Sequence, residues 1–353
     1  MIVYPLPPRL PTSPYLDQLY APMAALGVTV RRGRPRHELP ALLAGSGARL
    51  LHLHFFDELT QRRRRAETAA RTLALVALLG ALRARGVRLI WTAHNLAPHE
   101  LRHPGWAFLA YRAVARAADA VVAHSHAALA ELRARYGPPR RAVVIPHGSY
   151  IGLYGPPLPQ AESRVALGLP PTGRVTLCLG TLRPYKGVED LIRAFAQLPP
   201  ETRGTLLVAG AAKDRTYAAQ LTRLASAVPG ARVEPRFVPD DALPAHLAAA
   251  DLVALPYRSL LTSGVLLWAL SYARPVVAPA FGPVRELVCE GREGFLFPPG
   301  DVGGLRDALG RALAHPDLET LGEQGLEVAR ALGWPSIAAR TAALYREVTE
   351  EDR

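Results

Sequence analysis

Two cationic side chains, Arg183 and Lys186, stand between a short apolar strand and an amphipathic helix. The segment reads LCLGTLRPYKGVEDLIRAFAQL from Leu177 to Leu198, and its apolar residues after Gly187 recur at helical spacing. A strand-to-helix turn of this kind aims free backbone N–H groups and the positive end of the helix dipole outward. The pattern indicates an anion site, above all for phosphate. An ordinary turn with two solvated charges fits the local pattern equally well.

The lysine stands out because the chain has only two, Lys186 and Lys213, against 40 arginines. Where arginine supplies almost every surface charge, a lysine kept between a strand and a helix indicates a specific role. No Asp-x-Asp, HExxH or CxxC motif occurs, and the two cysteines suggest neither a metal cluster nor a disulfide framework. We therefore expect a chemistry without a metal ion or a cofactor, in a reducing, cytoplasmic setting.

A second helix start could also bind phosphate. Thr262 or Ser263 would cap the segment GVLLWALSY, which is apolar on all sides and therefore predicts a buried helix. Gly264 would let a ligand approach the free N–H groups of that helix. A capped core helix without a ligand is the stronger reading of this segment taken alone. Glu286 follows the next strand, where a carboxylate could accept from ribose hydroxyls; a solvated glutamate is the alternative.

Two histidines lie at the carboxyl ends of predicted strands, His54 in LLHLHFF and His94 in RLIWTAHNLAPHE. Histidines at the carboxyl ends of strands are candidates for catalysis or sugar binding, although a single one is more often structural. Two of them at neighbouring strand ends favour a functional role for His94. We also expect His54, Asn95 and Glu100 to contact an acceptor.

Positive charge is concentrated in the first half of the chain. Residues 1–170 carry 22 arginines and 9 acidic residues, a net charge of +13, whereas the remainder has a net charge of −1. Few aromatic residues accompany the basic ones, which argues against nucleic-acid binding. No apolar run approaches the roughly 20 residues that span a bilayer. The basic half is therefore the one expected to meet an anionic surface.

Four consecutive arginines precede the apolar stretch at residues 73–82: Arg62, Arg63, Arg64 and Arg65. Positive charge at a helix start opposes the helix dipole by roughly 0.3–1 kcal/mol per exposed charge. This cost suggests a use for the cluster, such as binding an anionic membrane surface. An arginine-biased composition on a solvated face explains it about as well.

The chain length predicts two domains, and strand patterns alternate with helical patterns throughout, which is typical of an α/β fold with parallel sheets. A stretch rich in glycine and proline, from Gly148 to Ser163, indicates a linker. The predicted strands cover residues 2–6, 28–31, 50–54, 88–92, 120–124, 142–146, 175–180, 205–209, 233–237, 252–255, 275–278 and 294–297. The predicted helices of the first half cover residues 15–26, 66–85, 104–117 and 127–135.

These segments together resemble the retaining GT-B glycosyltransferases of family four, the group 1 type. The resemblance rests on LGTLRPYKGVEDLIRAF, RFVPDDALPAHLAAADLVALPY, SGVLLWALSYARPVVAPAFGPVRELV and GREGFLFPPGDVGGL in the second half, and on WTAHNLAPHE, ADAVVAHS and VVIPHGSY in the first. It implies two Rossmann-like domains whose parallel sheets face a central cleft. Residues 1–155 would bind the acceptor, residues 156–333 the nucleotide-sugar, and the last helix, 334–353, would cross back to the first domain.

The resemblance also assigns residues. It implies that Lys186 neutralises the donor diphosphate and that His94 lies near the reacting sugar. The family commonly has an arginine after the strand glycine, whereas here Thr181 follows Gly180, so Arg183 takes that role. Residues that match the segment lining the nucleotide base are Arg236, Phe237 and Val238.

One family motif is altered. Leu260 and Trp268 stand where the family has two glutamates, so the ribose contact moves to Glu286. The backbone of Ser263 and Gly264 could still hold phosphate.

The implied activity is a metal-independent, retaining transfer of a sugar from a nucleoside-diphosphate sugar to a hydroxyl acceptor. A lipid-linked glycan or an exopolysaccharide precursor is the expected kind of acceptor, which would place the enzyme in the cytoplasm at the inner face of the cell membrane. The alternatives are a GT-B nucleotide-sugar epimerase or sugar phosphorylase, and a non-catalytic anion-binding scaffold.

Overall fold

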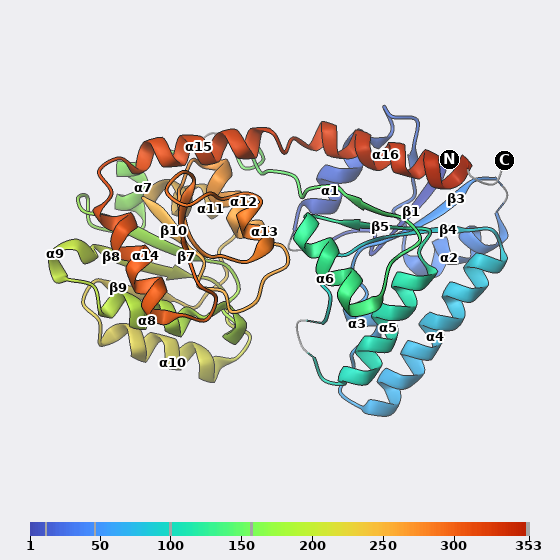
Figure 1. Ribbon diagram of the computed structural model, residues 1–353, viewed down its shortest axis with the longest axis horizontal. Helices are drawn as coiled ribbons and strands as arrows, with labels where there is room; N and C mark the ends of the chain where they lie inside the picture. The colour runs from blue at the N-terminus through green and yellow to red at the C-terminus, as the bar shows by residue number, and fades with distance from the viewer. Residues whose placement is uncertain (11–12, 46, 99–100, 156–157, 351–353) are drawn as a thin grey trace. The chain divides into compact units, whose positions relative to one another are not determined.

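The computed structural model describes residues 1–10, 13–45, 47–98, 101–155 and 158–350. The chain forms two compact units (Figure 1). Unit 1 comprises Met1–Gly148 and Gly333–Arg353, and unit 2 comprises Ser149–Leu332. Each unit contains a six-stranded sheet in which the paired strands run parallel. The predicted α/β fold with two parallel sheets is confirmed.

The sheet of unit 1 has the strand order β2-β1-β3-β4-β5-β6. Helices α1 and α16 pack with η1 in one apolar cluster on this sheet, and α4 and α5 lie side by side against β4 (Figure 1). Its strands are β1 (Ile2–Leu6), β2 (Thr29–Val30), β3 (Arg49–Leu53), β4 (Arg88–Thr92), β5 (Ala120–Ala123) and β6 (Ala142–Val144). Its helices are α1 (Tyr15–Tyr20), η1 (Ala21–Met23), α2 (Pro35–Ala44), α3 (Asp57–Thr60), α4 (Arg65–Ala84), α5 (Pro104–Ala117), α6 (His126–Tyr136) and α16 (Trp334–Glu350).

The sheet of unit 2 has the order β12-β11-β10-β7-β8-β9. Its strands are β7 (Val175–Leu179), β8 (Thr205–Ala209), β9 (Ala231–Glu234), β10 (Leu252–Ala254), β11 (Val276–Pro279) and β12 (Gly294–Phe297). Its helices are α7 (Gln160–Ala166), η2 (Pro184–Lys186), α8 (Val188–Ala196), α9 (Pro200–Arg203), α10 (Arg215–Ser226), η3 (Asp240–Ala242), α11 (Leu243–Ala249), α12 (Gly264–Ser271), α13 (Gly282–Arg285), α14 (Val302–Ala314) and α15 (Leu318–Arg330).

Helices cover both faces of the sheet in unit 2. All five residues of β7 are buried, as expected for a central strand of a parallel sheet. One apolar cluster joins the strands to α8, α10 and α14, and a second joins them to α11 and α12. The central strands therefore place their carboxyl ends, and the turns that follow, on a rigid base.

Two predicted elements end well before the predicted residue, and each ends close to a proline. The strand predicted to reach Phe237 ends at Glu234, because Pro235 has no N–H to continue the ladder. The helix predicted to reach Leu26 ends at Tyr20 and continues as a short 3₁₀ turn around Pro22. As a consequence, Arg236, Phe237 and Val238 lie in a loop beyond β9.

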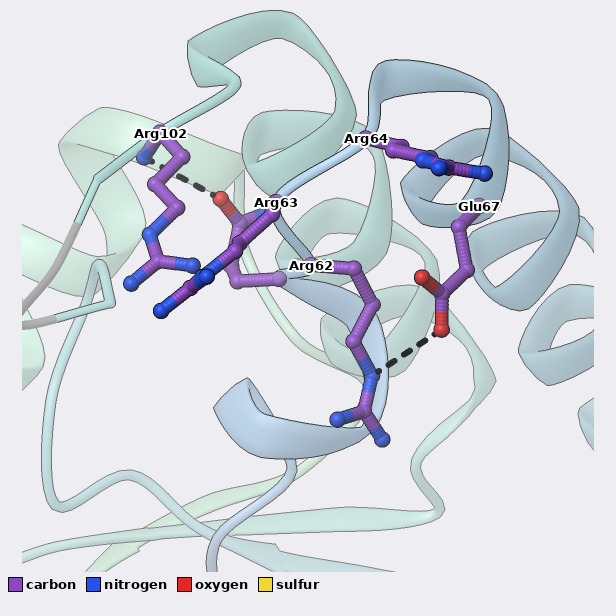
Figure 2. A pocket seen from close by; sticks show the side chains of 6 residues that line it. Arg62, Arg63, Arg64, Glu67 and Arg102 are labelled. Carbon is purple, nitrogen blue, oxygen red and sulfur yellow. Dashed lines mark hydrogen bonds and ion pairs between the residues drawn. The ribbon is translucent and has the colours of Figure 1, made fainter.

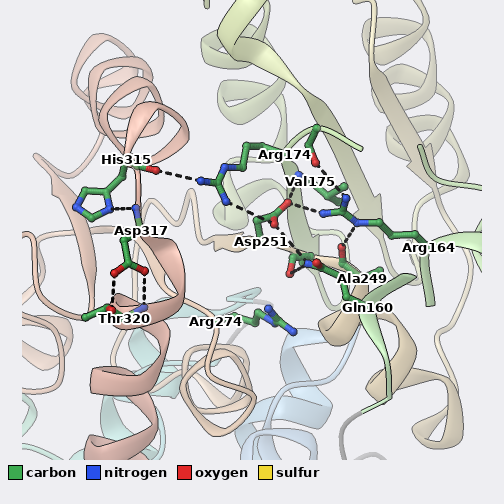
Figure 3. Close-up of polar contacts among 12 residues, drawn as sticks. Gln160, Arg164, Arg174, Val175, Ala249, Asp251, Arg274, His315, Asp317 and Thr320 are labelled. Carbon is green, nitrogen blue, oxygen red and sulfur yellow. Dashed lines mark hydrogen bonds and ion pairs between the residues drawn. The ribbon is translucent and has the colours of Figure 1, made fainter. Parts of the chain in front are cut away.

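In each unit, an aspartate before one strand forms a hydrogen bond with the backbone of the neighbouring strand. In unit 2, Asp251 lies just before β10. Its Oδ2 accepts a hydrogen bond from the N–H of Val175, the first residue of β7, at 2.6 Å. The same oxygen accepts from the buried Arg164 of α7 at 2.7 Å (Figure 3). In unit 1, Asp119 lies just before β5 and accepts from the N–H of Leu89 in β4 at 2.8 Å. Both contacts fix the start of a strand against its neighbour.

Loss of the Asp251 carboxylate should destabilise unit 2 strongly. Asp251→Ala leaves the buried Arg164 guanidinium without its carboxylate, which costs about 3–5 kcal/mol. The matched control is Asp307→Ala, whose exposed pair with Arg306 should contribute less than about 1 kcal/mol. The free energy of unfolding, from denaturant-dependent hydrogen exchange of β7 and β10, tests this. Equal, small losses in both variants would contradict it.

Candidate active site

The turn after β7 brings Lys186 back over the strand end. If Gly180 carried a Cβ atom, that atom would lie 3.0 Å from Lys186 Nζ and 3.4 Å from Val265 Cγ2. The Lys186 ammonium therefore lies at the carboxyl end of β7 and beside the first turn of α12. The structure thus brings together two of the predicted phosphate elements, the Lys186 turn and the α12 start, in one place.

Close backbone packing fixes this turn. The N–H of Leu182 donates to Ala211 O at 2.8 Å, which extends the β7–β8 pairing into the turn. Gly187 has a φ of 63°, and a Cβ there would lie 2.2 Å from Pro256 O, so no larger residue fits. The turn is held from both sides, by the loop after β8 and by the loop after β10.

The start of α12 has the predicted cap. The Ser263 side chain accepts from the N–H of Leu266 at 3.1 Å and is the N-cap. Thr262 Oγ1 is buried and has no hydrogen-bond partner among the described residues. A buried hydroxyl in this condition is uncommon in folded proteins and indicates a missing partner.

The two cations of the turn lack an acidic partner among the described residues. Lys186 Nζ lies 5.0 Å from the centroid of the Tyr257 ring, and neither Lys186 nor Arg183 forms an ion pair with any residue that the structure describes. Burial lowers the pKa of Lys186, and the Arg183 charge lowers it further. A bound anion would relieve both effects, so this turn is suited to a negatively charged ligand.

The other predicted donor residues follow three different strands of the sheet in unit 2. Thr181 is exposed directly after Gly180, in the same turn as Lys186. Phe237 is 62% exposed in the loop after β9, and in the sheet β8 lies between β9 and β7. Arg236 beside it forms an ion pair with Glu234. Val238 packs at the edge of the second apolar cluster. Glu286 is exposed at the end of α13, after β11.

In unit 1, the two predicted histidines are in contact. His54 Nδ1 lies 3.2 Å from His94 Nε2, both rings are buried, and Phe55 stacks on His94 at 4.2 Å between centroids. Asn95 lies half-buried in the loop after β4. Glu100 lies outside the described residues.

Two further groups extend this pair into a hydrogen-bonded row. His124 Nε2 lies 3.2 Å from His94 Nδ1, and His124 Nδ1 lies 2.9 Å from Ile145 O. At the other end, the Tyr20 hydroxyl lies 2.7 Å from His54 Nε2. We call Tyr20, His54, His94 and His124 the histidine row.

The carbonyl of Ile145 fixes the tautomer of each histidine in the row. A carbonyl only accepts, so His124 carries its proton on Nδ1 and accepts on Nε2 from His94 Nδ1–H. His94 Nε2 then accepts from His54, and His54 Nε2 accepts from the Tyr20 hydroxyl. Burial is the main cause that lowers the pKa of His54, His94 and His124, which keeps these rings neutral. Both ring nitrogens of His94 are therefore engaged.

The sequence contains a signal for the histidines that the prediction missed. His124 follows β5 directly and His147 follows β6, so four successive strands, β3 to β6, carry a histidine just past their carboxyl ends. Neighbouring parallel strands bring such residues together. His52, two residues before His54, also joins the group through hydrogen bonds to Tyr20 and Tyr345.

The first three residues of the predicted arginine cluster line a pocket of about 480 Å³ at the start of α4 (Figure 2). Arg62 pairs with Glu67 at 3.6 Å, and Arg65 is the first residue of α4. Arg63 and Arg64 are exposed, and no ion pair joins them to a described residue. The residues that line the pocket are Gln61, Arg62, Arg63, Arg64, Glu67 and Arg102.

No group of three His, Cys, Asp or Glu side chains in the described residues is arranged to hold a metal ion. None of the helices in the described part of the chain is long and apolar enough to cross a membrane.

Acid should weaken unit 1. Burial lowers the pKa of His52 to about 3, of His124 to about 4 and of His147 to about 3, whereas the unfolded chain takes up these protons near pH 6.5. Below about pH 6.5 the unfolded state binds more protons, so the free energy of unfolding falls as the pH falls, by up to about 1.4 kcal/mol per pH unit for each histidine. Above that pH the effect disappears.

The slope of the free energy of unfolding against pH shows which histidines contribute to the effect. In His124→Gln, the free energy of unfolding of unit 1 should change with pH between 4 and 6.5 by about one proton less than in the wild type. Ala130→Gln places the same side chain at an exposed position without removing a titratable group, and this control should leave the slope unchanged. An unaltered slope in His124→Gln would show that this ring is not buried neutral.

Comparison with known proteins shows which family this chain resembles. The family model described as Glycosyl transferases group 1 matches residues 173–315, and that described as Glycosyltransferase Family 4 matches residues 67–149. A GDP-mannose:glycolipid 4-beta-D-mannosyltransferase from Xanthomonas campestris pv. campestris is 32% identical over 278 residues, 77% of this chain and 71% of that protein. A D-inositol 3-phosphate glycosyltransferase from Thermobispora bispora is 31% identical over 286 residues, 75% of this chain and 66% of that relative.

Two solved structures share the fold at low sequence identity. A sucrose-phosphate synthase from Thermosynechococcus elongatus has a TM-score of 0.75 at 22% identity and covers 98% of each chain. Anabaena HepE in complex with UDP and glucose has a TM-score of 0.75 at 20% identity, over 98% of this chain and 99% of that one. The chain spans about two thirds or less of the length of the D-inositol 3-phosphate glycosyltransferases that it matches. The family models and the mannosyltransferase relative show that this chain belongs to the GT-B glycosyltransferases of group 1, family 4.

Proposed function

We propose that this protein transfers a sugar from a nucleoside-diphosphate sugar to a hydroxyl acceptor, with retention. One observation carries the proposal: the Lys186 ammonium, which has no acidic partner among the described residues, lies over Gly180 and beside the first turn of α12. A diphosphate placed there would meet a fixed cation, a helix start and the Thr262 hydroxyl. The mannosyltransferase relative, whose name includes GDP-mannose, supports a donor of this class.

The leaving diphosphate gains negative charge as the sugar departs. Lys186, Arg183 and the N–H groups at the α12 start would stabilise that charge with groups already in place, so no divalent ion is needed. Retention is supported by the family alone, and no residue is assigned as a base. His94 has both ring nitrogens in hydrogen bonds, so we propose that it contacts the reacting sugar as a neutral ring rather than removing a proton.

The nucleoside would lie across the carboxyl edge of unit 2. Phe237 is an exposed aromatic residue at this edge, and its ring offers a face on which a base can stack. We propose that Arg236 and Val238 line the base beside it and that Glu286 accepts from the ribose hydroxyls.

We further propose that unit 1 meets an anionic membrane surface, where a lipid-linked acceptor would be held, on the cytoplasmic side. Exposed apolar residues accompany the arginine cluster: Leu73 and Val76 on α4, Leu101 before α5, and Phe108 and Leu109 on α5. Arginine for headgroups and apolar side chains for the acyl boundary are the two components of interfacial binding.

Removal of either cation of the turn should abolish most activity. Lys186→Ala and Arg183→Ala should each lower turnover on the order of a hundredfold, because each removes a charge that stabilises the leaving group. Lys213→Ala, which removes the other lysine of the chain from an exposed position, is the control and should leave the rate unchanged. In the same assay, excess EDTA should not slow the wild type. Full activity of both turn variants, or a loss in EDTA that magnesium restores, would contradict this mechanism.

Product analysis in that assay separates the alternatives. A changed nucleotide-sugar formed without acceptor would indicate an epimerase, and a sugar phosphate formed from inorganic phosphate would indicate a phosphorylase. Donor binding without turnover would favour a non-catalytic scaffold.

Membrane binding should depend on the arginine cluster. Replacing Arg62, Arg63, Arg64 and Arg65 with glutamine should weaken binding to anionic vesicles, by roughly 1 kcal/mol per charge near the surface, and added salt should weaken it further. Donor binding should not change. The control replaces four other exposed arginines of unit 1 with glutamine: Arg116, Arg133, Arg135 and Arg140. Sedimentation with neutral and with anionic vesicles measures the difference, and equal binding to both kinds would argue against the surface.

A further inference from the structure

Arg258 lies beside the turn that carries Lys186, in the loop after β10. Its backbone N–H donates to Tyr185 O at 2.8 Å, and its Nη1 donates to Pro184 O at 3.1 Å. Tyr257, the residue before it, places its ring beneath the Lys186 ammonium. The loop therefore contacts the turn through main chain and side chain together.

The same guanidinium pairs with two carboxylates in the first turn of α8. Arg258 Nη1 lies 3.0 Å from Glu189 Oε1, and Nη2 lies 2.7 Å from Asp190 Oδ2. Glu189 is buried and also accepts from the Tyr217 hydroxyl at 2.6 Å. Asp190 has a second, weaker partner in the exposed Arg193, at 3.5 Å.

These carboxylates stand where negative charge would harm anion binding. They follow Lys186 by three and four residues, at the positive end of α8. Without a counter-charge they would repel a diphosphate and attract the Lys186 ammonium to themselves. Arg258 satisfies both of them, whereas Lys186 and Arg183 keep no acidic partner among the described residues.

We propose that Arg258 is a positioning residue for the donor diphosphate: by pairing with Glu189 and Asp190, it leaves the Lys186 ammonium to the ligand. The inference rests on the proposed function, because it assigns Arg258 a role through the same Lys186 site.

The first experiment measures the binding of UDP and of GDP by calorimetry. Arg258→Gln should weaken the binding of whichever nucleotide binds the wild type, on the order of tenfold, because two carboxylates lose their counter-charge. Arg193→Gln removes another arginine that pairs with the same Asp190 but does not contact the turn, and it should change the affinity by less than about twofold. Unchanged affinity in Arg258→Gln overturns the inference.

A second variant separates charge from structure. In the Arg258→Gln background, Glu189→Gln together with Asp190→Asn removes the unpaired negative charges, and the new amide oxygen at position 189 can still accept from Tyr217. If Arg258 acts by neutralising the carboxylates, this triple variant should bind the nucleotide within about threefold of the wild type. If Arg258 only braces the turn through Pro184 O, the lost contact is not restored, and the affinity should remain as low as in Arg258→Gln.

The outcomes also distinguish this inference from the function on which it rests. A wild type that binds neither nucleotide, or a fully active Lys186→Ala, overturns the proposed function and this inference with it. An inactive Lys186→Ala beside an Arg258→Gln that binds normally overturns only the role of Arg258.

Discussion

The main constraint on the proposed site in unit 2 is that the Lys186 ammonium must stay apart from the carboxylates near it. Lys186 lies partly buried at the carboxyl end of β7 in a chain that holds 30 acidic residues, two of them within the next four positions. An ammonium in such a place would ordinarily pair with the nearest carboxylate, since buried charges are costly unless paired. The rigid turn between the loops after β8 and β10, and the pairing of Arg258 with both nearby carboxylates, hold the lysine apart from them.

Unit 1 has the opposite requirement, because its buried polar side chains must form hydrogen bonds with one another. In the histidine row every donor points the same way, from Tyr20 toward Ile145 O, and no ring nitrogen of His54, His94 or His124 lacks a partner. Burial disfavours a proton added to any of these rings, so the row is stable only while it is neutral. The geometry that positions His94 therefore also makes unit 1 sensitive to acid.

The sequence predicted those features that depend on local pattern. The parallel sheets, the turn with Arg183 and Lys186, and the cap at Ser263 each follow from periodicity or from a short motif. The histidine row depends on strand order, because His54, His94 and His124 are far apart in the chain and meet only when β3, β4 and β5 are neighbours. Arg258 was missed for the same reason, since it lies 68 residues from Asp190 and nothing in its own segment indicates a partner.

The altered glutamate motif changes the polarity of the proposed donor site. Trp268 packs against Tyr150 at 5.3 Å between centroids, and its indole N–H is buried without a hydrogen-bond partner in the described part of the chain. Leu260 packs against the apolar cluster of α11 and α12. A glutamate accepts hydrogen bonds, whereas the indole N–H donates one. A sugar or ribose hydroxyl can donate or accept a hydrogen bond, so a nucleotide-sugar in contact with Trp268 would use its hydroxyl as the acceptor. With two carboxylates fewer to define the sugar, the proposed recognition of a nucleotide-sugar would rest more heavily on its diphosphate, and hence on the charge balance of Lys186, Arg183 and Arg258.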